Sequence, residues 1–514
     1  MGNAPVGRSD RVDVVVVGGG SAAYAAAIAA RQEGAERVVM LEKAPEHEAG
    51  GNPRFSHSGF RWVQDGPAEI RPFLRDMTDA EFARLKFEPY TAEQFNDHLT
   101  RATRGRMDPE LRQVLVGESN AALHWLRELD FKWAPDSHIV VDGIHYFEPG
   151  YSVHPLGGGL GQLSMLREIA EGLNIELRFQ SKVTAIHGTE HGVDGVRVSS
   201  PSERYDIEAA ATVLCSGGFQ ANREMRARYL GPNADLMKVR GSKHNTGEVL
   251  EAALQLGARA AGHWRRGHSS VVDANAPDFG IAFTKYNRYA YPYGISVNSA
   301  GQRFVDEASD LRMFTYAEMG WITLSQPGGV TWQIFDARTT GAEITRIAKT
   351  YQYAETAQTA NTIEELADKL GVRREALRDT VDAFNDAVDE SVPFDPTERD
   401  GRQARGLDVP KSNWANKIDR PPYVAYPVTA GITFTFGGLE IDTDARVIGT
   451  GGEPIPRLYA AGDITGIFYH GYVGSTGQTR NVVFARRAAA HLARAGANLG
   501  SAVLGQTAAV GQSA

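Results

Sequence analysis

Cysteine is almost absent from this chain of 514 residues, in which Cys215 is the only one. A single cysteine excludes an intramolecular disulfide, and it excludes an iron–sulfur cluster held by this chain alone. No CxxCH sequence marks an attached haem, and we expect no metal site. The simplest interpretation is residence in the cytoplasm, where thiols stay reduced.

Long apolar runs and basic runs are absent as well. No stretch approaches the ~18 consecutive apolar residues of a membrane-spanning helix, and the N-terminal MGNAPVGRSD lacks the apolar region of a signal peptide. The formal net charge is -9, which disfavours nucleic acid and anionic membrane surfaces as partners. We therefore expect no nucleic-acid partner and no direct membrane insertion.

The sequence does contain a compact strand–helix–strand unit near its N-terminus. Residues 12–17 form a nearly continuous run of valine, which is typical of a strand buried on both faces. Three glycines follow at 18–20, and the alanine-rich residues 21–34 predict a helix that packs closely on the sheet. A second strand is predicted over residues 37–41 and ends at Glu42. This order of elements indicates the fingerprint that binds dinucleotides.

Each small residue of this unit has a physical role in such a site. Gly18 permits the tight turn, Gly20 lets a pyrophosphate approach the helix N-terminus, and Ala23 occupies the third small position. Glu42 can accept hydrogen bonds from a ribose that carries a free 2′-hydroxyl, as in FAD or NAD. The alternative is an unrelated glycine turn in an α/β protein.

A second glycine- and serine-rich loop follows and favours FAD over NAD. It reads Gly50-Gly51-Asn52, then Ser56, Ser58 and Gly59, and a simple nicotinamide domain does not need it. Here the sequence resembles the fumarate reductase/succinate dehydrogenase flavoprotein superfamily, whose GGN-type loop lies against the flavin. The resemblance implies an α/β fold with a Rossmann-like FAD-binding domain and an inserted α+β cap domain that carries substrate.

Four later stretches extend the resemblance over nearly the whole chain. They are HPLGGGLGQ with the strand predicted at 175–179, VLCSGGF at 213–219, RLYAAGDITG from Arg457, and GYVGSTGQTRN opening the last helix. The N-terminal dipole of that helix would stabilise the electron-rich edge of a reduced flavin. The cofactor-binding residues that we expect are Gly18, Gly20, Ser21, Ala22, Glu42, Lys43, Gly51, Asn52, Ser56, Val183, Gly217, Gly462, Asp463, Ser475, Gly477 and Gln478.

The domain boundaries follow from the same comparison. Residues 1–262 are expected to form the first part of the FAD-binding domain, residues 263–424 the cap, and residues 425–514 the second part. Within the cap, Thr362 and Glu365 form a plausible capping box for a helix to residue 370, and a second helix is predicted over 373–389. We expect the Gly/Ala/Ser-rich tail after Gly496 to be disordered.

The resemblance also implies catalytic residues in the cap. QRFVDEASDLR is similar to the superfamily's RFVNE segment and places Glu307 and Arg312 near a proton relay. TWQIFDARTTG resembles the segment from which fumarate reductases supply an arginine general acid, which here is Arg338. Arginine stays protonated, so it needs resupply from a carboxylate such as Glu307. The alternatives for Arg338 are a carboxylate clamp and an ion pair with a cap-domain acid.

The substrate-binding residues depart from the fumarate pattern. His268 stands near the position of a carboxylate-binding histidine, and Tyr316 could share a helical face with Arg312. Thr433 and Phe434 replace the paired histidines of the HHTMGG turn, so a fumarate-type clamp is incomplete. Arg480 is either a partner for a third substrate carboxylate or an arginine on the helix surface.

Together these residues predict an FAD-dependent dehydrogenase that acts on a CH–CH bond of a small carboxylate. The closest resemblance is to the FAD-dependent tricarballylate dehydrogenases, which form cis-aconitate, through the HSSVVDANAPDFG, RFVDE and TFTFGG stretches. An alkene reductase, a 3-ketosteroid-type dehydrogenase and an electron-transfer subunit of a membrane assembly remain alternatives. We expect noncovalent FAD, because Asn52 stands where related enzymes carry the attaching histidine and His57 is out of register. An external electron acceptor is also required.

Overall fold

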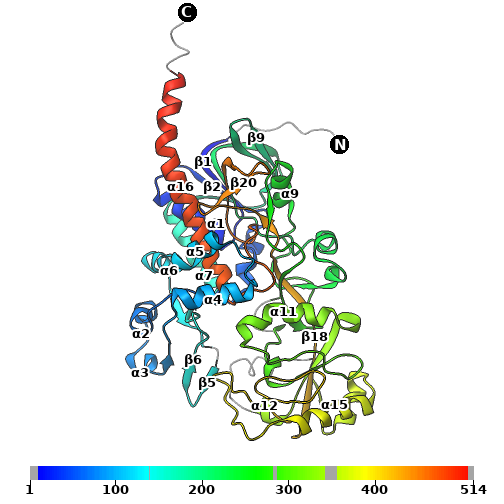
Figure 1. Cartoon of the computed structure of the whole chain (residues 1–514). Coiled ribbons are helices and arrows are strands. Elements are labelled where there is room, and N and C mark those ends of the chain that lie inside the picture. The colour runs from blue at the N-terminus through cyan, green and yellow to red at the C-terminus, as the bar shows by residue number, and fades with distance from the viewer. Residues whose placement is uncertain (1–9, 138, 282–285, 342–355, 508–514) are drawn as a thin grey trace, which may run out of the picture.

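The computed structural model describes residues 10–137, 139–281, 286–341 and 356–507. An eight-stranded sheet and its helices occupy one half of the molecule, and a six-stranded sheet occupies the other (Figure 1). Within the described residues, none of the helices has the length and apolar character needed to cross a membrane.

The first sheet has the path β20-β21-β11-β1-β2-β8, and the strand pairs from β21 to β8 are parallel. The valine run is its centre, because β1 pairs with β11 on one side and with β2 on the other. Val14 to Val17 are buried, as a strand covered on both faces requires. The predicted strands are confirmed with small shifts at their ends. The bounds are β1 (Asp10–Val17), β2 (Val38–Leu41), β8 (Glu176–Arg178), β9 (Lys182–Thr189), β10 (Gly192–Ser199), β11 (Arg204–Leu214), β20 (Arg446–Ile448) and β21 (Pro454–Ala460).

Helix α1 (Ser21–Gln32) lies between this sheet and α16 (Thr476–Thr507). Its residues from Ser21 to Ala30 are all buried, and the small alanine side chains allow both neighbours to approach closely. Helix α16 projects beyond the body of the molecule (Figure 1). It is assigned as far as Thr507, and the disorder expected after Gly496 stays a prediction. Residues 508–514 of the predicted tail lie outside the described residues.

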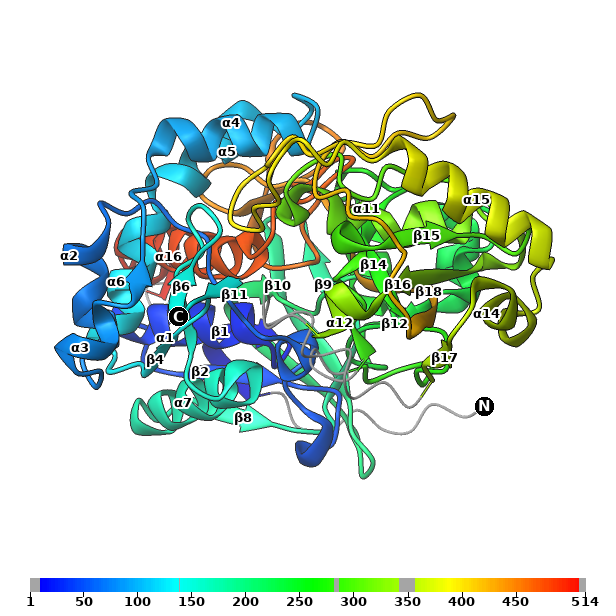
Figure 2. The ribbon, with the colours of Figure 1, turned by 90° about the horizontal axis from the view of Figure 1, so that it is seen from below.

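The second sheet is built around the long strand β18 (Tyr423–Thr435), with helices on both faces. Ala425 packs with α14 (Ile363–Leu370) and α15 (Arg374–Ala387), whereas Val428 packs with α11 (Arg312–Leu324). These two residues point to opposite faces, because they are an odd number of positions apart along a strand. Figure 2 shows α14 and α15 on the outer side. The other strands are β12 (Lys238–Val239), β14 (Gly267–Asp273), β15 (Ile295–Val297), β16 (Val330–Phe335) and β17 (Gln358–Ala360).

The domain boundaries at 263 and 424 stay predictions. The second sheet does not coincide with them, because its strand β12 precedes residue 263 and its strand β18 extends past residue 424. Other helices are α2 (Pro67–Ile70), α3 (Asp79–Phe82), α4 (Ala92–Ala102), α5 (Pro109–Gly117), α6 (Ser119–Glu128), α7 (Gly158–Gly172), α8 (Arg223–Met225), α9 (Glu248–Gln255) and α12 (Ala337–Gly341). Other strands are β3 (Leu85–Lys86), β4 (Trp133–Pro135), β5 (Ile139–Val141), β6 (Ile144–Tyr146), β7 (Val153–Pro155), β13 (Ala260–Ala261) and β19 (Gly438–Leu439).

Candidate active site

The carboxyl ends of β1, β2, β11 and β21 open into a cavity of about 830 Å³, which we call the nucleotide cavity. Ligands of parallel α/β sheets bind at this edge. Most of the cofactor-binding residues expected from the sequence line it. They are Gly18, Gly20, Ser21, Ala22, Glu42, Lys43, Gly51, Asn52, Val183, Gly217, Gly462 and Asp463.

Two glycines of the first turn show what the cavity accommodates. At Gly18, which has a φ of 132°, a Cβ would lie 2.4 Å from the carbonyl oxygen of Cys215, so the protein itself requires glycine there. At Gly20 the backbone is extended, and a Cβ would meet no protein atom closer than 3.8 Å. Packing within the protein does not explain glycine at that position. Close approach of a bound group to the backbone does, which is the role of this position in a dinucleotide site.

The N-termini of α1 and α16 are joined at this cavity. The Ser21 hydroxyl donates a hydrogen bond to Gln478 Oε1 at 2.9 Å, and the Asn481 amide donates to the Ser21 hydroxyl at 2.9 Å. The unpaired backbone N–H groups and the positive dipole end of a helix favour an anion. Two such ends at one cavity suit the pyrophosphate and the flavin edge of FAD.

Glu42 ends β2 as predicted and is buried. Its Oε1 accepts a hydrogen bond from the backbone N–H of Ala44 at 2.7 Å. Burial raises the pKa of this carboxyl, although the Ala44 N–H acts in the opposite direction. The adjacent Lys43 ammonium lies 3.0 Å from a carboxylate oxygen of Glu248, and burial lowers its pKa. Lys43 is therefore tied to a protein carboxylate at the rim of the cavity.

A second cavity of about 800 Å³, the substrate cavity, adjoins the first, and both are lined by Asn52, Pro53, Asp463 and Asn481. An elongated ligand can therefore run from one into the other. The remaining predicted cofactor residues, Ser56, Ser475, Gly477 and Gln478, line this cavity. So do the predicted substrate-binding residues His268, Tyr316, Thr433 and Phe434.

Arg240 also lines the substrate cavity, and the sequence analysis missed it. Its guanidinium donates to Ser270 Oγ at 2.7 Å, to Thr433 Oγ1 at 2.8 Å and to Asn287 Oδ1 at 3.0 Å. All three acceptors are neutral, and no carboxylate of the described residues forms an ion pair with Arg240. The side chain is 8% exposed. A buried guanidinium without a carboxylate partner at a cavity wall is a ready site for an anionic substrate.

His268 is the second polar group of this wall. It is 4% exposed, and among the described residues neither ring nitrogen has a hydrogen-bond partner. Burial, assisted by the charge of Arg240, holds the pKa of His268 well below its usual value. The imidazole is therefore neutral near pH 7, with one N–H donor and one lone pair available to a ligand.

Tyrosines form much of the remaining wall, and three of them were not predicted: Tyr151, Tyr289 and Tyr472. Burial raises the pKa of Tyr472 to about 12 and raises that of Tyr316 well above its usual range. Both phenols therefore stay protonated and can donate hydrogen bonds. Nothing in the short sequence patterns around these tyrosines distinguishes them from core residues.

Arg338 and Glu307 lie away from the substrate cavity in this structure, and their catalytic roles stay predictions. The Arg338 guanidinium lies 2.8 Å from Asp419 and donates to the Lys417 carbonyl, an ion pair of the cap that the sequence left open as an alternative. Glu307 is fully buried, where it accepts from the Ser296 N–H at 2.7 Å and pairs with Arg303 at 2.6 Å. Neither residue lines the substrate cavity.

Arg312 lies closer to the substrate cavity than Arg338 does. Its guanidinium is 2.9 Å from Glu148 and stacks over the rings of Tyr289 and Tyr316, which line that cavity. Burial acts to lower the pKa of Arg312, but Glu148 and the tyrosines raise it, and the net shift is upward. Arg312 itself lines a neighbouring cavity of about 1120 Å³ that Tyr289 also borders. Arg312 is thus a permanently charged group that is separated from the substrate cavity by the rings of Tyr289 and Tyr316.

Arg480 lies beside the substrate cavity, and its role toward a third substrate carboxylate stays a prediction. It is 1% exposed, forms an ion pair with Asp463 and lies over the rings of Phe434 and Phe468. Asp463 itself lines both the nucleotide and the substrate cavity. Arg480 therefore holds a predicted cofactor residue in place, and it does not line the substrate cavity.

Comparison with known proteins agrees with this geometry. Residues 13–479 match the FAD binding domain family, so the chain belongs to that family. The probable fumarate reductase Ifc3 of Shewanella frigidimarina is 28% identical over 95% of this chain and 76% of its own length. The open form of a flavocytochrome c3 fumarate reductase has a TM-score of 0.72 at 26% identity, covering 95% of this chain and 79% of that one.

The fold is shared more widely. The 3-ketosteroid Δ1-dehydrogenase of Sterolibacterium denitrificans superposes with a TM-score of 0.73 at 20% identity, over 95% of this chain and all of the other. The chain is therefore an FAD-dependent oxidoreductase with the fumarate reductase fold that acts on carbon–carbon bonds. The glycine turn and the paired helix ends fit FAD, which when bound accepts the two electrons and one hydrogen of the oxidised bond.

Proposed function

We propose that this enzyme dehydrogenates the CH–CH bond next to a carboxylate, and that tricarballylate, oxidised to cis-aconitate, is the substrate. The observation that carries the proposal is Arg240, a buried guanidinium at the wall of the substrate cavity with neutral partners only. The Nε and Nη1 atoms of Arg240 donate to these protein partners, and Nη2 remains to donate a charge-assisted hydrogen bond to a substrate carboxylate. The motif resemblance supplies the finer choice of a tricarboxylate.

The remaining roles follow from the same wall. Arg240 would bind the carboxylate, and the phenols of Tyr289 and Tyr316 would donate hydrogen bonds that orient the substrate. As the bond is oxidised, one carbon loses a hydride and its neighbour loses a proton. His268 is neutral and has a free lone pair, so it would accept that proton. Arg312, which lies behind Tyr289 and Tyr316, would make the electrostatic potential in the substrate cavity more positive and so favour a negatively charged substrate.

A less charged substrate of the 3-ketosteroid kind is the second candidate. Phe434 and the tyrosines give the cavity an aromatic wall, and among the described residues Arg240 is the only arginine that lines it. The 3-ketosteroid dehydrogenase shares the fold, although at its level of identity the likeness extends no further. A substrate with a carbonyl oxygen in place of a carboxylate would use the tyrosine hydroxyls.

Anaerobic titration of the FAD-loaded enzyme distinguishes these candidates. We expect tricarballylate to bleach the flavin absorbance in the absence of any acceptor, and we expect 3-ketosteroids to leave it unchanged. Bleaching by a 3-ketosteroid alone would replace the proposal with the second candidate. No bleaching by any di- or tricarboxylate would overturn it. Turnover requires an external electron acceptor or electron-transfer protein, and we propose that the enzyme works in the cytoplasm.

We further propose that FAD is held noncovalently. Asn52 donates to the Thr433 carbonyl at 2.6 Å and accepts from the Ser242 N–H at 3.1 Å, so the position of the attaching histidine in related enzymes has a structural role here. Acid precipitation should release all of the yellow colour into the supernatant. Colour retained in the pellet would show a covalent bond, for which His57 is the residue to examine because it lines the substrate cavity.

A further inference from the structure

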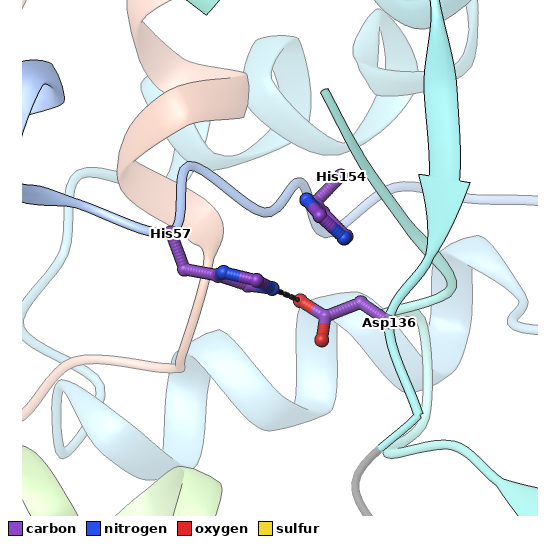
Figure 3. A group of neighbouring side chains, drawn as sticks. All are labelled: His57, Asp136 and His154. Atoms are coloured by element: carbon purple, nitrogen blue, oxygen red, sulfur yellow. Dashed lines mark ion pairs between the residues drawn. The ribbon is translucent and has the colours of Figure 1, made fainter. Parts of the chain in front are cut away.

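Three side chains converge beside the substrate cavity without a role in the proposed reaction. His57, Asp136 and His154 each offer one ligand atom, and these atoms all lie within 4.8 Å of one another (Figure 3). Nε2 of His57 is 2.8 Å from Oδ2 of Asp136, and the ring centroids of His57 and His154 are 4.0 Å apart. The Asp136 carboxylate is fully buried. We propose that these residues bind a divalent transition-metal ion of the zinc type.

The backbone fixes this arrangement. β4 pairs antiparallel with β7, and the pairing continues where the N–H of Asp136 donates to the carbonyl of Ser152. Asp136 therefore opposes Ser152, and His154, two residues further along β7, projects from the same face as its diagonal neighbour. His57 approaches that face from the glycine- and serine-rich loop. The site is thus built from a two-stranded ladder and one loop.

The donor set suits the metal. Two imidazoles and one carboxylate are the protein ligands of a tetrahedral site that keeps one open position, with metal–ligand distances of about 2.0–2.2 Å. Tetrahedral coordination places neighbouring ligand atoms about 3.4 Å apart. The His57–Asp136 separation of 2.8 Å needs only a small opening to admit the ion. A cation also compensates the charge of a buried carboxylate.

An outer ligand shell and a route to the site are present as well. The hydroxyl of Tyr151 donates a hydrogen bond to Asp136 Oδ2, as outer partners of metal-bound carboxylates do. A Cβ at Gly59 would lie 1.9 Å from the Tyr151 ring, so glycine at position 59 makes room for that side chain. His57 and Tyr151 both line the substrate cavity, through which the ion can enter. A water or a carboxylate oxygen from the cavity would occupy the open position.

The metal-binding test is independent of catalysis. FAD-loaded, tag-free protein is stripped with a chelator, incubated with Zn²⁺ and passed through gel filtration, and bound zinc is measured by mass spectrometry. We expect one zinc per chain, lost in His57→Ala, in His154→Ala and in the isosteric Asp136→Asn. Tyr151→Phe should weaken zinc affinity roughly ten- to hundredfold. His191→Ala is the matched control, because His191 is exposed and outside the group.

The zinc content of the wild type and of the variants decides whether the site exists. Stoichiometric zinc that is retained by His191→Ala and lost by the ligand variants supports the site, with flavin content and circular dichroism showing that each variant is folded. Zinc content in the wild type equal to that of His57→Ala or His154→Ala would overturn it. The group would then be a hydrogen-bonded cluster only. X-ray absorption at the zinc edge should show nitrogen and oxygen neighbours at about 2.0–2.2 Å.

A consequence for substrate choice rests on the proposed function. A divalent ion would add positive charge for a second carboxylate, which Arg240 alone does not supply. Zinc loading should therefore lower the concentration of tricarballylate that half-bleaches the flavin, with little effect for a monocarboxylate. An unchanged midpoint would exclude the metal from substrate binding. Flavin bleaching without any zinc site, or a zinc site without bleaching, would show which of the two proposals fails.

Discussion

At the scale of single residues, glycine is required at positions 18 and 20 for different reasons. Gly18 has a positive φ and contacts the Cys215 carbonyl, whereas Gly20 is extended and faces open space in the nucleotide cavity. The sequence predicted both from the spacing of the turn, because the βαβ unit is local in the chain. It could not predict that Arg338 would be paired with Asp419, a residue far away in the sequence.

The two glycines lead to contrasting predictions. Gly20→Ala should fold normally but purify with much less flavin, because the added methyl group occupies the space where the pyrophosphate approaches. Gly18→Ala should lower the melting temperature even without flavin, because a Cβ there clashes with backbone. Flavin absorbance and thermal melting of the apo forms measure the two effects. Normal flavin content in Gly20→Ala would show that the cavity is not used in this way.

At the scale of elements, strands and helices were predicted well where a local signal defines them. Helix α14 begins after Thr362, whose hydroxyl accepts from the Glu365 N–H at 3.1 Å, although the Glu365 carboxylate accepts from Asn361 and not from Thr362. Half of the predicted capping box is therefore confirmed. The start of helix α16 was predicted from the GSTGQTRN stretch, whereas the Gly/Ala/Ser composition after Gly496 gives a weak helical signal.

Removing this cap gives a prediction for the element alone. Thr362→Ala should destabilise α14 by about 1 kcal/mol, because one N-terminal N–H loses its partner. Amide hydrogen exchange should quicken in α14, with little change in α1. Flavin content should stay normal, because α14 lies on the outer side of the second sheet (Figure 2). Unchanged exchange in α14 would show that the hydroxyl does not stabilise the helix.

At the scale of the whole molecule, the substrate cavity is assembled from segments far apart in the sequence. The loop from Asn52 to Gly59, Arg240, His268, α11 and the start of α16 meet there. Motif resemblance located the segments that carry a recognisable pattern. It missed Arg240, because a single arginine between valine and glycine has no pattern of its own. The fold alone shows that no acidic side chain in the described part of the chain pairs with it.

Histidines that are fully or partly withdrawn from water make the folded molecule sensitive to acid. Burial lowers the pKa of His98 to about 4, and it also lowers the pKa of His268. Between about pH 6.5 and 4 the unfolded chain therefore binds protons that the folded chain does not, so the free energy of unfolding falls as the pH falls. Glu42 and Asp336, whose pKa values are raised by burial, offset part of this loss.

The contribution of one histidine can be isolated by a variant. His98→Gln should show a smaller drop in melting temperature between pH 7.5 and pH 5.5 than the wild type, because glutamine does not titrate. The exposed His191 provides the control, and His191→Gln should retain the wild-type drop. Equal drops in the wild type and His98→Gln would mean that His98 does not contribute to acid sensitivity.

The most direct test of the account compares Arg240→Lys with Arg338→Lys in anaerobic single-turnover reduction of the flavin by tricarballylate. If Arg240 holds the substrate carboxylate, the lysine of Arg240→Lys cannot both keep the hydrogen bonds to Ser270, Thr433 and Asn287 and reach the substrate, so roughly ten- to hundredfold more substrate should be needed for half-maximal reduction. Arg338→Lys should match the wild type, because Arg338 pairs with Asp419 away from the cavity. Both variants must retain full flavin. Normal reduction by Arg240→Lys together with loss in Arg338→Lys would contradict the account.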